Sequence, residues 1–269
     1  MNTPTETFQI TREGAEMYES RFVPALFAGW SEDLLDMAGP RAGQDVLDVA
    51  CGTGVVARAV ADRLAGSGHV VGVDLNATML DVAAWLRPDI EWRQGDAVSL
   101  PFADAAFDLV TCQAALMFFP DPVQALREMS RVARPTGAVV ALVPGRFESS
   151  PAYVRLAEVA AQHMPGAADL FRTYFAHGDL KQLTGLFAQA GLQVQATRTA
   201  MHDVVFPSLE EFVATEVGAT PLADQIDPDS YRRLLADARA ALSGYVTADG
   251  TSRVPIESHI VRAIPAGAT

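Results

Sequence analysis

Apolar side chains in the first forty residues recur at every third or fourth position, which is the period of an amphipathic helix. The residues with this spacing include Tyr18, Phe22, Leu26, Phe27 and Trp30. The pattern predicts two helices, over residues 12–22 and 27–39, the second ended by a Gly-Pro pair. Both segments are amphipathic, so each is expected to bury one face against the rest of the protein.

The pattern changes between residues 45 and 143, where short apolar runs alternate with segments of helical period. The expected strands are residues 45–49, 69–75, 90–96, 107–113 and 137–143, and the expected helices are residues 55–65, 77–86 and 123–133. The strands are apolar throughout rather than at every second position. This is typical of a parallel sheet that helices cover on both faces.

The remaining chain combines further helices with two strands of a different kind. Helices are expected over residues 150–164, 179–191, 208–218 and 230–246, and strands over residues 193–206 and 258–264. Ser208 followed by Glu211 forms a capping-box pattern at the start of the third helix. We therefore predict an α/β fold, with a Rossmann-like, mostly parallel sheet of seven strands, an antiparallel C-terminal edge and a helical cap.

The domain organisation follows from the same patterns. The sequence contains no internal repeat, low-complexity segment or flexible linker, so residues 1–269 are expected to form a single domain. Within this domain we predict a ligand-binding core, cap elements that cover the substrate, and a C-terminal part that completes the sheet around inserted helices. The core is residues 41–148, the cap elements are residues 1–40 and 149–190, and the C-terminal part is residues 191–269.

The charge balance limits the partners. The chain carries 33 acidic residues against 20 lysines and arginines, a formal net charge of −13. Because nucleic-acid binding requires a basic surface that displaces counterions, a nucleic-acid partner is disfavoured. No apolar run approaches the roughly 18–20 residues that cross a bilayer, and the polar N-terminus lacks the features of a signal peptide. We expect a cytoplasmic protein with no membrane span.

The two cysteines, Cys51 and Cys112, lie at the ends of expected parallel strands. This placement is unfavourable for a disulfide, and neither cysteine has a histidine at the spacing of a metal site. Both are expected to be reduced thiols, with no metal.

The segment VLDVACGTG (46–54) contains the chemistry that narrows the function. Gly52, Gly54 and Ala57 match the loose glycine pattern of dinucleotide-binding turns, so a nicotinamide or flavin site is one alternative. Asp74 follows Gly54 by 20 residues, where an acid commonly binds ribose hydroxyls. Asp96 ends the next expected strand, so carboxylates gather at one edge of the sheet.

Asp48 argues against a dinucleotide. It precedes the glycine turn, and residues 42–57 contain no arginine or lysine. A pyrophosphate on this turn would meet a carboxylate with no basic side chain to offset it. A cationic, phosphate-free adenosine suits three acids better: an ammonium near Asp48, a ribose on Asp74 and an exocyclic amine on Asp96. S-adenosylmethionine has this chemistry, whereas an NAD(P)-dependent oxidoreductase gives Asp48 no role.

These motifs resemble those of the class I S-adenosylmethionine-dependent methyltransferases. The resemblance covers residues 46–143 and is closest to ubiquinone and menaquinone methyltransferases and to small-molecule methyltransferases of secondary metabolism. The matching segments, in order, are VLDVACGTG, VVGVDLNATML, QGDAVSLPF, FDLVTCQAALMFFPD and ALREMSRVARPTGAVV. The resemblance implies S-adenosylmethionine as the cofactor and S-adenosylhomocysteine as the product.

The resemblance also implies roles for single residues. Asp48 orders water and the ligand's ammonium, Asp74 holds the ribose, and Gln113 closes the methionine end. Three small residues bring their backbone close to the methionine part of the ligand. Two apolar side chains pack on the adenine ring, and an acidic residue with its neighbour contacts the exocyclic amine of the adenine. These further residues are Ala50, Gly52 and Gly54 for the backbone, Leu75 and Met79 for the packing, and Asp96 with Ala97 for the amine.

The acceptor is less well defined. His177 is the candidate catalytic base, with His163 behind it, although an acidic phenol would need no base. An aromatic, weakly charged cap favours a flat, largely apolar small molecule, such as an aromatic or polyketide-like metabolite methylated on O, N or C. Expected substrate contacts are Tyr18, Phe22, Trp30, Met117 and Tyr174, with Phe27, Phe118, Phe171 and Phe175 in the same lid. A non-catalytic cofactor-binding protein stays open as an alternative, and so does a homodimer.

Overall fold

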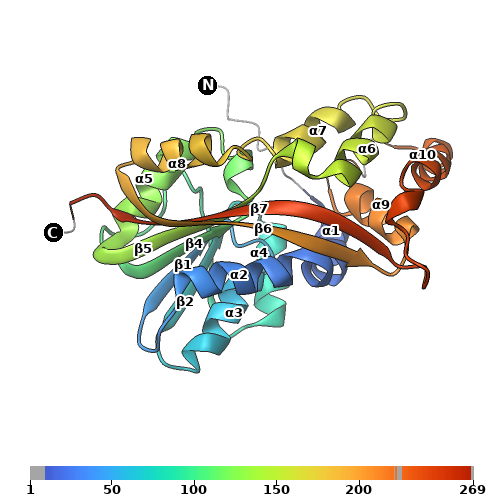
Figure 1. Cartoon of the computed structure of the whole chain (residues 1–269). Helices are drawn as coiled ribbons and strands as arrows, with labels where there is room; N and C mark the ends of the chain where they lie inside the picture. The colour runs from blue at the N-terminus through green and yellow to red at the C-terminus, as the bar shows by residue number, and fades with distance from the viewer. Residues whose placement is uncertain (1–9, 221, 223–225, 268–269) are drawn as a thin grey trace, which may run out of the picture.

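A mixed sheet runs through the molecule, in the order β3-β2-β1-β4-β5-β7-β6 (Figure 1). The structure is a computed structural model and describes residues 10–220, 222 and 226–267. Within this part of the chain the sheet has seven strands. They are β1 (Asp45–Val49), β2 (His69–Asp74), β3 (Glu91–Gln94), β4 (Phe107–Gln113), β5 (Ala133–Pro144), β6 (Leu192–Phe206) and β7 (Ser252–Pro265).

The strand directions confirm the predicted fold class. Strands β1 to β5 are parallel, with Val46 of β1 paired to Val70 of β2 and to Leu109 of β4. Strand β7 is antiparallel to both β5 and β6, so the C-terminal strands form an antiparallel edge. Chain order runs outward from β1 to β3 on one side and from β4 to β5 on the other, with β7 inserted between β5 and β6. The space between β1 and β4 is therefore the switch point at which open α/β sheets bind ligands.

Helices cover both faces of the sheet, and the strand residues show why. Helices α2 and α3 lie on one face, and α5 and α8 on the other (Figure 1). Successive strand residues point to opposite faces, and Val46 and Leu47 are both fully buried, each in a separate core cluster. The helices are α2 (Ala28–Ala38), α3 (Val55–Leu64), α4 (Ala77–Leu86), α5 (Pro122–Val132) and α8 (Leu180–Gln189).

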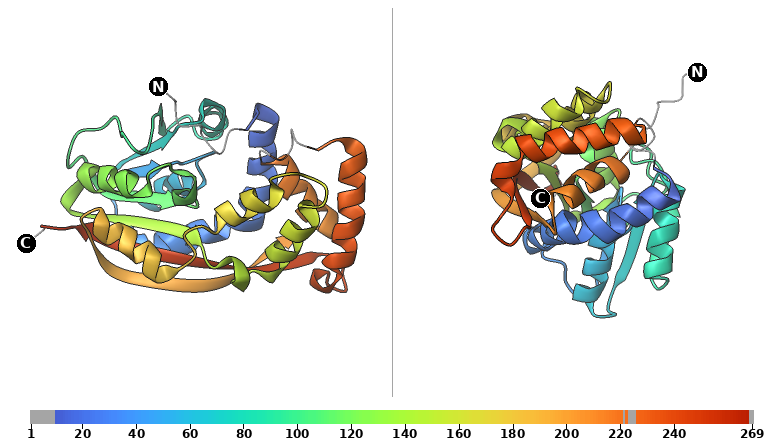
Figure 2. Two further views of the ribbon diagram at one scale, coloured as in Figure 1. Left: turned by 90° about the horizontal axis from the view of Figure 1, so that it is seen from above. Right: turned by 90° about the vertical axis from the view of Figure 1, so that its right-hand side faces the viewer.

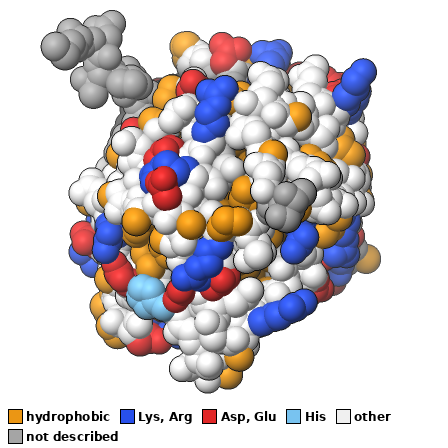
Figure 3. Space-filling view, turned by 90° about the vertical axis from the view of Figure 1, so that its left-hand side faces the viewer, with side chains coloured by type: hydrophobic (Ala, Val, Ile, Leu, Met, Phe, Trp, Pro, Cys, Tyr) orange, Lys and Arg blue, Asp and Glu red, His pale blue; other side chains and the backbone are white. Residues whose placement is uncertain are grey.

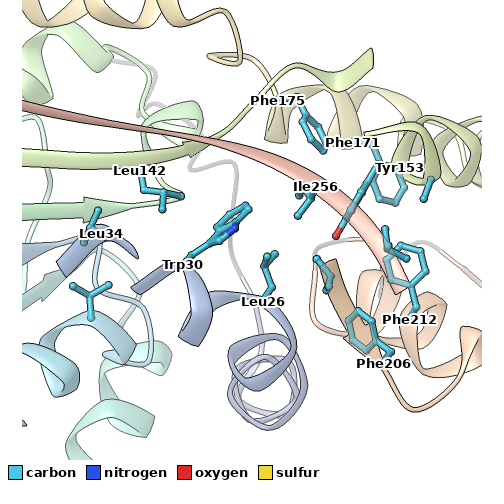
Figure 4. Packing of buried hydrophobic residues seen from close by; sticks show 14 of the residues in the cluster. Leu26, Trp30, Leu34, Leu142, Tyr153, Phe171, Phe175, Phe206, Phe212 and Ile256 are labelled. Atoms are coloured by element: carbon cyan, nitrogen blue, oxygen red, sulfur yellow. The ribbon is translucent and has the colours of Figure 1, made fainter. Parts of the chain in front are cut away.

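The remaining helices form a cap at the end where β6 and β7 extend beyond the parallel strands (Figures 1 and 2). Its interior is aromatic, with Tyr153, Phe171, Phe206 and Phe212 fully or almost fully buried (Figure 4). Helix α8, which the sequence grouped with the cap, packs instead on the sheet beside α5. The cap helices are α6 (Pro151–Ala160), α7 (Ala167–Tyr174), α9 (Leu209–Gly218) and α10 (Pro228–Ala241), and short 3₁₀ turns are η2 (Leu116–Phe118), η3 (Phe147–Ser149) and η5 (Ser243–Tyr245).

The N-terminal helix corrects the prediction of two separate helices. Helix α1 (Arg12–Met17), the π-helical segment η1 (Tyr18–Phe27) and α2 follow one another without a loop. Pro24 lies inside η1. Proline lacks the N–H of the usual i→i−4 bond, so helical bonding must be altered around it. The chain leaves α2 at Gly39, in the left-handed region at φ 61°, as predicted.

Long-range pairing sets other boundaries. Strand β7 begins at Ser252, opposite Phe206 of β6, six residues before the predicted start at Ser258. Helix α7 was not predicted. Both elements depend on partners that are distant in the sequence, so local periodicity does not reveal their full extent.

Charges of both signs are interspersed on the face shown in Figure 3. Several arginines are held by two carboxylates each. Arg134 contacts Asp45 and Asp108, and Arg63 contacts Glu32 and Asp36. Pairing of this kind reduces the positive potential that a polyanion would require.

Candidate active site

A cavity of about 780 Å³ opens at the carboxyl ends of β1, β2 and β4 and extends to the cap. Three surfaces enclose most of it. The strand wall is Ala50, Gly52, Asp74, Leu75, Asn76, Met79, Asp96, Ala97 and Gln113. The aromatic wall is Tyr18, Phe22, Leu26, Phe27 and Trp30, and the cap wall is Tyr153, Tyr174, Phe175, Glu216 and Thr220.

The backbone turns sharply where β1 and β4 end. Ala50 and Ala114 both adopt the left-handed region, at φ 53° and φ 52°, and both line the cavity. This conformation costs a residue with a Cβ about 1–2 kcal/mol. Strained backbone of this kind is concentrated at functional sites, where the surrounding structure over-determines it. The two neighbouring strand ends are therefore held in position around one space.

Asp74 joins the ends of β1 and β2. One carboxylate oxygen accepts a hydrogen bond from the Gly52 N–H at 2.7 Å, and the other accepts from the Asn76 N–H at 2.8 Å. Burial raises the pKa of Asp74, while these backbone N–H groups act in the opposite direction. Each oxygen keeps a further lone pair for a ligand hydroxyl.

Apolar surface surrounds this carboxylate. Leu75 is 40% exposed and forms an open shelf, whereas Met79 and Ala97 are buried on the same wall. Asp96 accepts a hydrogen bond from the Val98 N–H at 3.0 Å and faces the cavity. A flat heterocycle with an exocyclic amine fits such a surface, because it offers both an apolar face and a donor.

Asp48 lies behind this wall, which corrects its expected contact with the ligand. It is 1% exposed and does not line the cavity. Its oxygens accept hydrogen bonds from the Thr111 hydroxyl at 2.9 Å and from the Ala57 N–H at 3.2 Å. Burial raises its pKa to about 7 against these two bonds. Asp48 therefore connects β1 to β4 and to the first turn of α3.

The second glycine of the turn also serves packing rather than ligand approach. Gly54 lies at φ 86°, and a Cβ there would be 2.3 Å from the Trp92 ring. Gly52 lines the cavity at φ 55°, and a Cβ there would meet no atom within 4 Å. The expectation that both glycines bring the backbone to the ligand is thus corrected: Gly54 makes room for an indole.

The aromatic wall places the expected N-terminal side chains together. Tyr18 stacks on Phe27 with ring centroids 5.1 Å apart, and Phe27 meets Trp30 edge-on at 5.9 Å. Gln113 of β4 donates a hydrogen bond to the Phe27 carbonyl at 3.1 Å, which ties the helix to the strand wall. All five residues expected to contact substrate lie on the cavity lining: Tyr18, Phe22, Trp30, Met117 and Tyr174. Phe27, Phe118 and Phe175 also line it, whereas Phe171 is buried in the cap.

The structure does not bring the histidine candidates to the cavity. His177 is half-buried, its ring is hydrogen-bonded to the Leu116 carbonyl, and burial lowers its pKa. His163 is paired with Asp237 at 2.8 Å. Neither histidine lines the cavity, so the role of base that we expected for His177 is corrected to a local structural contact.

Glu216 lines the cavity and is the carboxyl of the lining that sequence reasoning missed. It lies on α9 and is 1% exposed. Leu209, Phe212 and Val213 form an apolar stripe on this helix, and Glu216 occupies the next position of the stripe. A carboxyl at a core position of an amphipathic helix was the signal, because buried acids are rare unless they are paired.

Unpartnered polar atoms gather on this lining. Among the described residues, the buried side-chain atoms without a hydrogen-bond partner include Trp30 Nε1, Asn76 Nδ2, Gln113 Oε1, the Tyr174 hydroxyl and both Glu216 oxygens. Buried polar groups are otherwise almost always bonded, so these atoms point to a ligand.

The charged side chains of the cavity lining indicate which class of ligand fits. It has three carboxyl side chains, Asp74, Asp96 and Glu216, and none of the described lining residues is lysine, arginine or histidine. A pyrophosphate would be disfavoured here, whereas the ammonium, sulfonium and ribose hydroxyls of S-adenosylmethionine would meet acceptors. Over the described part of the chain, no three metal-binding side chains come together, and no helix has the length and apolarity of a membrane span.

Comparisons with known proteins agree with this geometry. A family model described as a methyltransferase domain matches residues 47–141. The chain is 33% identical over 190 residues to the demethylmenaquinone methyltransferase of Lysinibacillus sphaericus, which covers 69% of this chain and 73% of that protein. It spans about half the length of several other curated relatives of this name.

Solved structures show the same fold. The YcgJ protein of Bacillus subtilis has a TM-score of 0.60 at 20% identity, over 88% of this chain and 97% of that one. Phosphoethanolamine N-methyltransferase 2 of Haemonchus contortus, in complex with S-adenosylmethionine, has a TM-score of 0.61 at 19% identity, over 95% of this chain and 57% of that one. Since the matched family segment supplies the strand wall, and the lining suits a cationic adenosine, this chain belongs to the S-adenosylmethionine-dependent methyltransferases and is an enzyme that uses S-adenosylmethionine as its cofactor.

Proposed function

We propose that this enzyme methylates an O, N or C atom of a small, flat and largely apolar metabolite. The observation that supports the proposal is the single cavity, which continues from the strand wall to the aromatic and cap walls. Its volume of about 780 Å³ lies in the range of small-molecule sites. The cofactor and a second small molecule could therefore lie side by side, away from solvent.

In this proposal the strand wall binds the cofactor. The Asp74 carboxylate accepts from the ribose hydroxyls, and Asp96 accepts from the adenine amine beside Ala97. Leu75 and Met79 pack on the adenine. The backbone at Ala50 and Gly52 borders the methionine moiety, where Gln113 offers its unpartnered oxygen to the ammonium. These contacts are favourable because each pairs an acceptor with a donor or a cation.

The aromatic wall orients the acceptor. Tyr18, Phe22 and Trp30, with Met117 and Tyr174 from other elements, present apolar faces on which a flat molecule can stack. When bound, S-adenosylmethionine supplies an activated methyl group for in-line displacement. The protein aligns the acceptor atom with that methyl group and excludes water, and these two effects account for most of the catalysis that the side chains provide.

The name of the Lysinibacillus relative suggests one member of this acceptor class, a demethylmenaquinone-like molecule. The matched family segment ends at residue 141, before the cap begins at Pro151. Most of the proposed acceptor contacts therefore lie outside that segment, with Met117 as an exception. A place in secondary metabolism, a cytoplasmic location, a homodimer and the division into core, cap and C-terminal parts stay predictions.

Calorimetry with S-adenosylhomocysteine followed by methyl transfer from isotope-labelled S-adenosylmethionine tests the proposal. We expect binding of the product and labelling of at least one member of a panel of phenols, naphthols, hydroquinones and aromatic amines. Lack of S-adenosylhomocysteine binding would overturn the proposal. Binding without labelling of any acceptor would favour the alternative of a non-catalytic cofactor-binding protein.

A further inference from the structure

Glu216 is poorly satisfied within the fold. Both of its oxygens are buried and neither makes a hydrogen bond of good geometry with a described residue, although the Tyr153 hydroxyl lies close enough to interact with the carboxyl. The nearby Thr220 hydroxyl donates instead to the Glu216 backbone carbonyl at 2.7 Å. No described lysine, arginine or histidine lines the cavity, so the carboxyl is not half of an ion pair on this wall.

Two tyrosines from separate helices face this carboxyl. Tyr153 of α6 is buried, and Tyr174 of α7 is partly buried with a buried hydroxyl; burial, followed by the nearby Glu216 charge, raises the pKa of each hydroxyl. Tyr153 lowers the pKa of Glu216, but burial is the larger effect and raises it to about 8. In Figure 4 the Tyr153 hydroxyl extends from its ring toward the interior, on the side of Ile256 and Leu26. Polar atoms of three helices thus converge in surroundings that are otherwise apolar.

An unpartnered buried carboxyl is costly for the fold. Moving such a group out of water without a compensating hydrogen bond costs several times the net value of an ordinary hydrogen bond. A leucine at this position would continue the apolar stripe of α9 without that cost. Residues that break a local rule in this way are expected at functional sites.

We propose that Glu216 binds a hydrogen-bond-donating group of the acceptor, a hydroxyl or an amine, and thereby selects acceptors that carry such a group on an aromatic body. The assignment rests on the proposed methyl transfer and adds the acceptor's recognition element. Once the carboxyl is ionised, both Glu216 oxygens are acceptors, so the partner that they lack is a hydrogen-bond donor. An acceptor with a carboxylate or phosphate at this position would be repelled, because the lining contains acids and no base.

Glu216→Gln tests the assignment, with Glu211→Gln as the matched control. Glu211 lies on the same helix but forms a surface ion pair with Arg21 at 2.8 Å, outside the cavity. The probes, offered to protein loaded with S-adenosylhomocysteine, are β-naphthol, β-(aminomethyl)naphthalene and β-naphthoate, which share one ring system. Calorimetry should show that the wild type prefers the hydroxyl or amine probe to the naphthoate. At pH 9, where the Glu216 carboxyl is ionised, Glu216→Gln should weaken the preferred probe at least ~10-fold, as expected for losing a charge-assisted hydrogen bond.

Affinity for S-adenosylhomocysteine should change less than about 2-fold in both variants, because Glu216 lies on the cap wall. Equal probe affinities in wild type and Glu216→Gln, a wild-type preference for the naphthoate, or binding of S-adenosylhomocysteine without any of the probes would each overturn the assignment. A wild type that fails to bind S-adenosylhomocysteine overturns the proposed function, and this assignment with it.

Thermal unfolding gives a second readout that does not need an acceptor. If Glu216 serves a ligand, Glu216→Leu should raise the unfolding midpoint by a few degrees, about 2–6 °C, because a buried unpartnered carboxyl is replaced by an apolar side chain. A fall in the midpoint would show that the carboxyl stabilises the empty fold, and would overturn the assignment.

Discussion

The strand wall and the cap wall enclose one cavity but are built in opposite ways. On the strand wall the carboxylates are held by nearby backbone N–H groups, as Asp74 is by Gly52 and Asn76. On the cap wall Glu216 has no hydrogen-bond partner, although Tyr153 approaches it from another helix. The strand wall is therefore pre-formed by its own turns, whereas the cap wall carries a carboxyl without a well-formed hydrogen bond.

This difference separates two tasks. A pre-formed wall loses little conformational freedom when it binds, and this suits a cofactor that every member of the family shares. A polar group without a partner in an apolar wall adds little to the affinity for most ligands. It strongly disfavours any ligand that buries the group without forming a hydrogen bond to it. We infer that the strand wall provides affinity and the cap wall provides selectivity. The following predictions test this division.

Breaking the packing beneath the strand wall should have the largest effect. Gly54→Ala places a Cβ 2.3 Å from the Trp92 ring at a left-handed residue, and should lower the free energy of unfolding by about 3 kcal/mol. Urea denaturation measures the loss. Gly29→Ala is the control: it lies in α2, where a Cβ meets no atom within 4 Å, and should be neutral or stabilising. Equal stabilities of the two variants would contradict the packing role of Gly54.

Removing the charge of the strand wall should weaken the cofactor next. Asp74→Asn replaces an oxygen that accepts from the Gly52 or Asn76 N–H with an amide donor, and removes the carboxylate offered to the ribose. We expect affinity for S-adenosylhomocysteine to fall about 100-fold, equivalent to ~2.7 kcal/mol, by calorimetry. Asp81→Asn on the exposed side of α4 should bind as the wild type does. A wild-type affinity in Asp74→Asn would place the cofactor elsewhere.

Glu216 of the cap wall should make the free energy of unfolding depend on pH. Burial raises the pKa of Glu216 from 4.5 to about 8, so the folded protein keeps a proton that the unfolded chain releases between these values. The folded state binds more protons, and stability therefore falls as the pH rises through this window. The stability of the wild type relative to Glu216→Gln should decrease by on the order of 3 kcal/mol between about pH 5 and 8. Tyr153 and Tyr174, which face the carboxyl, stay protonated throughout. A constant difference would show that Glu216 is ionised in the folded protein.

The smallest effect should come from His177. Because its ring is hydrogen-bonded to the Leu116 carbonyl and does not line the cavity, His177→Gln should change the rate of methyl transfer less than about 2-fold. Steady-state rates with an acceptor identified from the panel would measure this. A fall of ~100-fold in the methyl-transfer rate, with unchanged cofactor affinity, would instead show that His177 acts as a base.

Local patterns predicted the central strands and helices well, because the residues that show each pattern are the same residues that form the element. The predicted bounds of β1 (Asp45–Val49) and β4 (Phe107–Gln113) are those observed, and α4 (Ala77–Leu86) agrees as well. Each is a short apolar run or helical period bounded by turn residues. Strand β7, by contrast, extends past its local signal because β6 pairs with it along its full length.

The candidate site divides in the same manner. Strand ends predicted that Asp74 and Asp96 would meet at one edge, since parallel strands end together, and the family resemblance added Gln113; all three line the cavity. Spacing does not determine on which side of a turn a side chain lies. Asp48 and Gly54 therefore belong to the same motif and yet face the interior, toward Thr111 and Trp92.

By itself the sequence determined the sheet, the edge at which a ligand binds and the charge of that edge, because all three follow from periodicity and residue type over short distances. Only the tertiary structure decided the acceptor's surroundings. Tyr153, Tyr174 and Glu216 lie on three helices separated along the chain, and they meet because the cap packs on the extended strands β6 and β7. Contacts at that range depend on how the whole chain buries its apolar surface, and no local pattern specifies them.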